Sequence, residues 1–154
     1  MQMKKVLAAV VAVLMLSCSF TVSAFAETEI TIPHVEESLP YQRVVEQAIG
    51  SSGAGEALAG NWTDHLGTVW NGALGISNGG FVVYDVSGSK CTKLAGSILP
   101  GADLKKGSAM TVIISVDGKA LYTSNPMGPD SRGECFEIDI SNASQLKIEC
   151  AAAK

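Results

Sequence analysis

Two tryptophans, an aspartate, a histidine and an asparagine lie within a short stretch of the chain, and a tyrosine stands farther on. Aromatic faces pack against the C–H groups of a pyranose, and carboxylate, imidazole and amide groups make directional hydrogen bonds to hydroxyls. This mixture suits sugar binding, and the candidate carbohydrate-binding residues are Trp62, Asp64, His65, Trp70, Asn71 and Tyr122. Taken singly, Trp62 also fits a core position, and Asp64 fits a residue that caps a turn.

Catalytic motifs are missing from the sequence. His34 and His65 are its only histidines, and it contains no Gly-x-Ser-x-Gly elbow, His-Glu-x-x-His pair or Gly-rich phosphate loop. We therefore expect a protein that is not an enzyme and has no cofactor. One alternative stays open, a structural calcium ion bound by loop carboxylates such as Asp103 or Asp130.

Residues 1–26 have the pattern of a secretory signal peptide. Lys4 and Lys5 precede an unbroken apolar run of 11 residues, and small residues flank Phe25 before the expected cleavage after Ala26. The run is too short for a membrane span. We expect a secreted or extracytoplasmic bacterial protein. The alternative is a lipoprotein, because Cys18 follows the apolar run directly.

Charge and composition exclude further classes. The chain is 47% hydrophobic and 17% charged, which is typical of neither a disordered tail nor a coiled coil. Without residues 1–26, 128 residues remain and the formal net charge falls from −4 to −6. A protein of this size forms one domain. Because it is acidic, we expect it to lack the basic surface that binds nucleic acid or anionic lipid.

Residues 27–60 read as a leader with one short helix and a Gly/Ser-rich linker. The helix is expected over 40–49, where apolar residues recur at helical spacing and Gly50 ends the pattern: Tyr41, Val44, Val45, Ala48 and Ile49. So short a helix is marginal alone, so its stripe must dock on the following domain or on a protein partner.

Residues 61–154 predict an all-β sandwich. Short strands are bounded by turn residues and are expected at 81–86, 92–98, 111–116, 120–123, 135–140 and 145–150. Asp117-Gly118 between two of them predicts a tight hairpin. Alternation places Val112, Ile138 and Ile148 inward, with Glu137 outward.

Three cysteines follow the signal segment. Cys91 and Cys135 share the outward parity, so they are the better candidate disulfide pair if their strands are neighbours. Cys150 shares the inward parity and then behaves as a small buried hydrophobe.

The β part resembles the NPCBM family, the novel putative carbohydrate-binding modules, over about residues 60–150. The matching segments are Trp62-Thr63-Asp64 with Gly67 and Asn71, Phe81–Gly88, Lys93–Ile98, Val112–Val116, Asp117–Tyr122, Ile138–Ser141 and Gln145–Ile148. The resemblance implies a galactose-binding-like jelly roll in a secreted or cell-surface protein. The function expected is non-catalytic binding of a glycan, and the alternative is a structural or adaptor protein that binds a protein partner.

Overall fold

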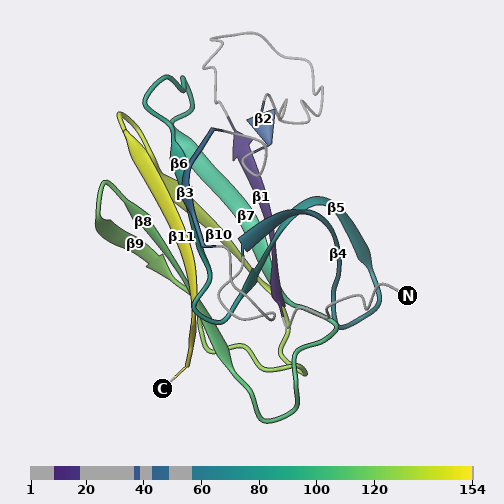
Figure 1. Ribbon diagram of the computed structural model, residues 1–154. Coiled ribbons are helices and arrows are strands. Elements are labelled where there is room, and N and C mark those ends of the chain that lie inside the picture. Colours follow the sequence, from purple (N-terminus) through teal and green to yellow (C-terminus); the bar gives the residue numbers. More distant parts are fainter. Residues whose placement is uncertain (1–8, 18–36, 39–42, 49–56, 154) are drawn as a thin grey trace, which may run out of the picture.

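The computed structural model describes residues 9–17, 37–38, 43–48 and 57–153, and in the first two ranges the backbone alone. These residues form a sandwich of two antiparallel β-sheets and contain no helix (Figure 1). The predicted all-β sandwich is therefore confirmed.

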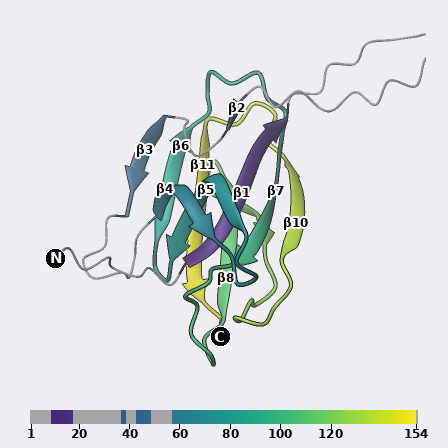
Figure 2. The same ribbon diagram turned by 90° about the vertical axis from the view of Figure 1, so that its right-hand side faces the viewer.

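One sheet, sheet A, has the strand order β10-β7-β1-β5-β4, with β2 paired to β1. Its strands are β10 (Glu134–Asp139), β7 (Lys93–Pro100), β1 (Ala9–Ser17), β5 (Val69–Ser77), β4 (Ala57–Thr63) and β2 (Glu37–Ser38). Strand β1 crosses the middle of this sheet between β5 and β7 (Figure 2).

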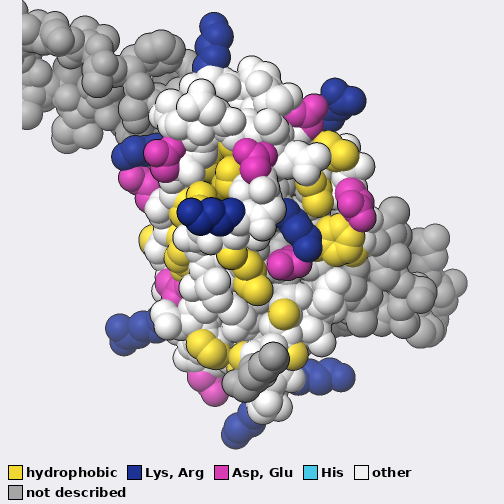
Figure 3. Space-filling view, turned by 90° about the vertical axis from the view of Figure 1, so that its left-hand side faces the viewer, with side chains coloured by type: hydrophobic (Ala, Val, Ile, Leu, Met, Phe, Trp, Pro, Cys, Tyr) yellow, Lys and Arg dark blue, Asp and Glu magenta, His cyan; other side chains and the backbone are white. Residues whose placement is uncertain are grey.

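The other sheet, sheet B, has the order β3-β6-β11-β8-β9. Its strands are β3 (Val44–Gln47), β6 (Phe81–Asp85), β11 (Gln145–Ala152), β8 (Met110–Val116) and β9 (Lys119–Thr123). Figure 3 views the molecule from the side on which β8, β9 and β11 lie in Figure 1, and there charged side chains of both signs are scattered among hydrophobic ones.

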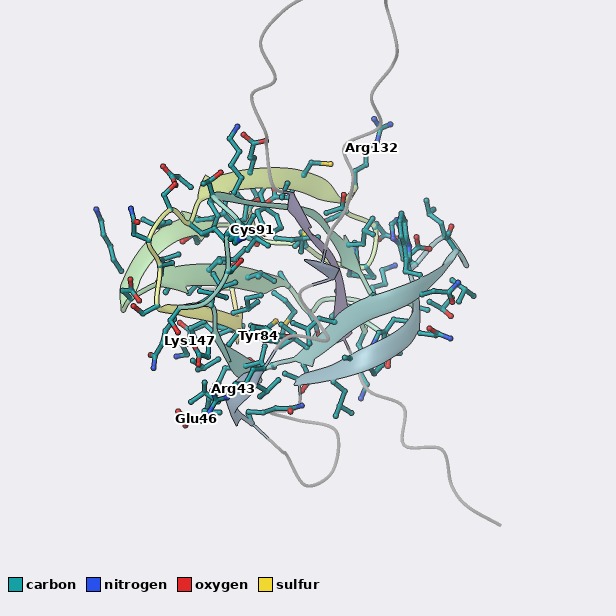
Figure 4. The ribbon with its side chains drawn as sticks, turned by 90° about the horizontal axis from the view of Figure 1, so that it is seen from above. Arg43, Glu46, Tyr84, Cys91, Arg132 and Lys147 are labelled. Carbon is teal, nitrogen blue, oxygen red and sulfur yellow. The ribbon has the colours of Figure 1, made fainter. Side chains whose placement is uncertain are left out.

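The core lies between the sheets and follows the predicted alternation. Ile114 and Ile148 are opposite each other in β8 and β11 and are fully buried, whereas Glu137 is exposed. Tyr84 of β6 is also buried in this core (Figure 4). The inward rows of both sheets thus exclude water from one shared apolar layer, which is the main stabilising term of such a sandwich.

The tight turn between β8 and β9 is as predicted. Asp117 and Gly118 both have positive φ, 46° and 81°, the combination that a two-residue hairpin turn requires. Asp117 also accepts hydrogen bonds from the backbone N–H groups of Ser144 and Gln145 at 3.1 and 2.8 Å. The turn is therefore fixed to the start of β11.

The predicted helix over 40–49 is wrong where the structure describes it. Val44–Gln47 form β3, an edge strand paired to β6, while 40–42 and 49 lie outside the described residues. Val44 and Val45 are 41% and 54% exposed, so the expected apolar stripe is not buried. Pairing with a sheet edge supplies hydrogen-bond partners to a segment too short to be a stable helix.

Strand β4 starts at Ala57, and β1 and β3, which precede it in the chain, also belong to the two sheets. Strands β4 and β5 were not among the predicted strands. Ala57 is nevertheless fully buried, and Leu74 and Ile76 of β5 belong to the core. The segment around the tryptophans is therefore part of the sandwich.

The predicted Cys91–Cys135 bridge is not formed, since Cys135 is a free, exposed thiol. Cys91 is buried and precedes β7, so strand alternation does not extend to it. Cys135 lies opposite Ser97, and Ser97 comes six residues after Cys91 in the chain. At the rise of an extended strand this separates the two cysteines by roughly 20 Å, far beyond the reach of a disulfide. Cys150 is free and buried, as expected.

Candidate functional site

Asp64 organises the tip of the β4–β5 hairpin. It is 2% exposed, and its Oδ1 accepts hydrogen bonds from the backbone N–H groups of Leu66 and Thr68 at 2.8 and 2.9 Å. Its Oδ2 accepts the indole N–H of Trp70 at 2.8 Å. Asp64 is therefore a turn-capping residue that also orients Trp70.

The charged form of Asp64 is favoured by these contacts. Burial raises the pKa of Asp64, but the hydrogen bonds from Trp70, Thr68 and Leu66 act in the opposite direction and leave the pKa below its ordinary value of 3.8. Asp64 is thus a carboxylate at neutral pH. The indole of Trp70 is held by a charge-assisted hydrogen bond.

A β-bulge at Gly72 decides which face of sheet A Trp70 occupies. From Gly60 to Trp62 is two steps along β4, and it pairs with the three steps from Ala73 to Trp70 along β5; Gly72 has a φ of 67°. Without the extra residue, Trp70 would share the inward parity of Leu74. With it, Trp70 is turned to the outer face, beside Trp62.

Trp62 lies flat on the same outer face. A Cβ atom at Gly75 would come within 2.3–2.6 Å of the Trp62 ring, so the indole rests directly on the Gly75 backbone. Its N–H donates to the carbonyl of Leu58 at 3.0 Å. Trp62 is half-buried and its indole N–H is already hydrogen-bonded. Of the two tryptophans, Trp62 therefore packs against the sheet, and Trp70 is the one that lines the hollow.

A shallow hollow of about 570 Å³ begins at Trp70 and runs over the outer face of sheet A. Its lining residues come from β5, β7 and β10: Trp70, Ala95, Gly96, Ser97, Cys135, Phe136 and Glu137. We call it the Trp70 hollow. It combines an aromatic side chain with a hydroxyl, a thiol and a carboxylate on an open surface.

The polar groups of the hollow already interact with one another or with its rim. Ser97 Oγ and Cys135 Sγ are 3.3 Å apart, and Lys93 Nζ donates to Glu137 Oε1 at 2.7 Å. The hydrogen bond to Glu137 and its charge raise the pKa of Lys93. All of these side chains reach solvent, so a ligand hydroxyl can share or replace their partners.

The remaining candidates lie apart from the hollow. His65 belongs to the hairpin tip, where its backbone N–H donates to Pro100, and Asn71 is an exposed residue of β5. Tyr122 packs on Phe136 with ring centroids 5.1 Å apart and donates to Glu134, which also accepts from the side chain of Asn125. Burial, then the contact with Glu134, raises the pKa of Tyr122. The structure therefore brings Trp62, Asp64 and Trp70 together and places Tyr122 in a separate cluster.

Metal binding finds no support in the described residues. In the ranges that the structure describes, no three His, Cys, Asp or Glu side chains gather closely enough to hold an ion. Asp103 and Asp130 thus lack the carboxylate cluster that a calcium ion would require. Across these same residues, no helix is long and apolar enough to cross a membrane.

Ser97, Cys135 and Glu137 line the hollow but were not among the predicted sugar-binding residues, and Cys135 was predicted only as a disulfide partner. Cys135 and Glu137 share one outward parity, which the sequence does indicate. Their position beside Trp70 depends on the strand order of sheet A, for which the sequence has no local signal.

The chain matches the family model described as the NPCBM/NEW2 domain over residues 48–154. It therefore belongs to the NPCBM/NEW2 family. The comparison with curated proteins finds none that matches.

Solved structures with the same fold include two from Clostridium perfringens ZmpB. One contains its CBM51-2 and INT domains, with a TM-score of 0.58 and 18% identity, covering 75% of this chain and 27% of that one. The other contains the M60 catalytic domain with CBM51-1 and CBM51-2, with a TM-score of 0.52 and 14% identity, covering 73% and 13%. The chain thus spans about a quarter or less of these larger proteins, and the likeness is one of fold.

Proposed function

We propose that this protein is an exported, non-catalytic module that binds a glycan in the Trp70 hollow. The observation that carries the proposal is the fixed indole of Trp70, turned outward by the Gly72 bulge and held by Asp64 beside Ser97 and Glu137. An aromatic face next to a few hydroxyl and carboxylate groups is the composition that sugars require.

The comparisons support the class of ligand. The family is named for carbohydrate-binding modules, and the similar solved domains are themselves designated CBM51. The hollow is shallow and its one accessible aromatic face is that of Trp70, since Phe136 is buried, so we expect weak affinity, in the range of roughly tens to hundreds of micromolar.

Export rests on residues 1–26, whose charge, apolar run and small residues suit a signal peptide. Intact mass of the exported protein tests it, because cleavage after Ala26 leaves Glu27 as the first residue. A lipidated Cys18 at the N-terminus would instead establish the lipoprotein alternative.

The exported protein is screened on an array of plant, host and bacterial glycans, beside Trp70→Ala and Trp70→Phe. We expect Trp70→Ala to lose binding by about tenfold or more, since it removes the stacking face. Trp70→Phe keeps a ring but loses the hydrogen bond to Asp64, and it should fall between the two.

Phe81→Ala is the matched control, because it removes an aromatic ring from sheet B, where Phe81 lies under Lys147. Circular dichroism verifies that each variant folds. Equal loss of binding in both alanine variants, or unchanged binding in folded Trp70→Ala, would place the site elsewhere.

A protein partner is the second candidate function. The helix once expected to carry it is replaced by the edge strand β3, which exposes Val44 and Val45. Arg43, Glu46 and Lys147 lie on that flank of the molecule (Figure 4). Failure of the intact protein to bind any arrayed glycan would favour this function.

A further inference from the structure

Strand β1 joins the two halves of sheet A. It pairs with β5 over Ala9–Ala12 and with β7 over Val10–Ser17, while β5 otherwise pairs with β4 and β7 with β10. Without β1, the sheet is two separate strand pairs. The gap left between β5 and β7 is called the β1 slot below.

All of β1 lies within the segment that export removes. Cleavage after Ala26 takes Ala9–Ser17 away, and so does cleavage before Cys18. An empty slot would leave one edge of β5 and one of β7 without hydrogen-bond partners. It would also uncover Leu74 and Ile98, which are 1% and 0% exposed.

The pairing register determines which positions of a strand in the slot face the core and which face outward. Position 12 lies opposite the core residues Leu74 and Ile98, and position 16 lies opposite Leu94. Even positions therefore face the core. Positions 13 and 15 lie opposite Ser97 and Ala95, two residues of the Trp70 hollow, so odd positions face outward.

We propose that the new N-terminal segment of the exported chain, Glu27–Ile32, takes the place of β1. Its sequence, Glu-Thr-Glu-Ile-Thr-Ile, alternates in the way the slot requires. Shifted by sixteen positions, Thr28, Ile30 and Ile32 occupy the inward positions, and Glu27, Glu29 and Thr31 occupy the outward ones. The β-branched residues of this segment also have high strand propensity.

Chain direction and length agree with this register. In the structure Leu16 and Met15 of β1 pair with Glu37 and Ser38 of β2. In the replacement, Ile32 and Thr31 take those two places, and the loop back to β2 is residues 33–36. Four-residue loops are common in hairpins, and Pro33, which cannot donate to a ladder, falls at the loop.

This inference rests on the export part of the proposed function, because the slot opens only when cleavage removes β1.

A disulfide tests the register directly. In the exported protein carrying Cys135→Ser, the pair Thr31→Cys and Ala95→Cys should form an intramolecular bridge, since the two positions become direct cross-strand neighbours. The control pair is Thr31→Cys with Ser115→Cys, on sheet B. No 31–95 bridge, equal bridging in the control, or a bridge between two chains would overturn the proposal.

Stability gives an independent readout. We expect Ile32→Asp to lower the thermal midpoint by about 5 °C or more, whereas Thr31→Asp, on the outward face, leaves it nearly unchanged. Amide exchange of Leu74 and Leu94 should be slow in the parent and about tenfold faster in Ile32→Asp. Equal midpoints for the two variants would contradict the assignment of faces.

The outcomes separate this proposal from the others. An exported chain that still begins at Met1 keeps β1 and ends the slot proposal, while glycan binding at Trp70 stands. Glycan binding lost on Trp70→Ala with no 31–95 bridge rejects the slot proposal alone. A 31–95 bridge with no glycan bound rejects the glycan function alone.

Discussion

Asp64 is the residue on which the hairpin tip depends, and its protonation is therefore a stability effect. The pKa of Asp64 is lowered in the folded state, so the unfolded chain binds the proton first. The stabilisation is complete above about pH 3.8 and is lost as pH falls through the folded-state value. Asp85 and Asp139 also have lowered pKa values and contribute to the same acid limb.

Asp64→Asn isolates the contribution of Asp64. Its amide cannot provide two carboxylate oxygens, so at pH 7 we expect a loss of about 1–3 kcal/mol in the free energy of unfolding. The difference from the parent should shrink as pH drops below 3.8, since the contributions of Asp85 and Asp139 cancel. Urea unfolding from pH 7 to pH 2 measures it, and a constant difference would show that folding does not lower the pKa of Asp64.

The two free cysteines should differ sharply in reactivity. Cys135 is exposed, whereas Cys150 is buried, and burial raises the pKa of the Cys150 thiol to about 12. At pH 8 a thiol reagent should modify Cys135 in the native protein and Cys150 only after denaturation. Peptide mapping checks this with Cys135→Ser as control, and native labelling of Cys150 would show that the β11 core opens readily.

The role of Asp64 as a turn cap is the part of the site most visible in sequence. An aspartate followed by Gly67 at a hairpin tip bonds backbone N–H groups close in the chain, so local chemistry suffices to predict it. The hydrogen bond to Trp70 needs only six residues of separation and the hairpin itself. Cys135 is the opposite case, since its surroundings are set by residues far away in sequence.

At the scale of single strands, the Gly72 bulge is the element that exposes Trp70. Gly72 has a φ of 67°, which L-residues with a Cβ rarely adopt. We expect Gly72→Ala to cost about 1 kcal/mol of stability and to weaken glycan binding, because relaxing the bulge returns Trp70 toward the core side. Binding assays and tryptophan fluorescence measure the two effects.

Gly88→Ala is the control for that variant. Gly88 has open space around its Cα, so a methyl group is tolerated there. Unchanged binding and fluorescence in folded Gly72→Ala would mean that the bulge does not determine the direction of Trp70.

Strand prediction from sequence worked where alternation is unbroken. Strands β6 to β11 combine regular inward rows with clear turn residues, and all six were predicted. Strand β5 contains Gly72 and Gly75, and β4 contains Gly60. These glycines accommodate the two tryptophans and interrupt the apolar alternation of both strands. The sequence of β3 predicts a helix instead of a strand, because apolar positions over so few residues fit either period.

For the whole molecule, the fold class was predictable and the site was predictable only in part. Two-sided alternation between turns specifies a sandwich, and the resemblance of many short segments to one family agrees with it. The Trp70 hollow is built by β5, β7 and β10, which are distant in sequence. Strand order and register are tertiary properties, so the contribution of Ser97 and Glu137 could not be read from local patterns.

Strand β1 has one more consequence, for the timing of biogenesis. Under the proposed export, the residues that complete sheet A in the full chain would also be the apolar residues that an export machinery recognises. Folding before export and delivery to the membrane would then compete for one segment, and a precursor that folds first would hide its own targeting signal. We expect export to require that the newly made chain is engaged before it folds.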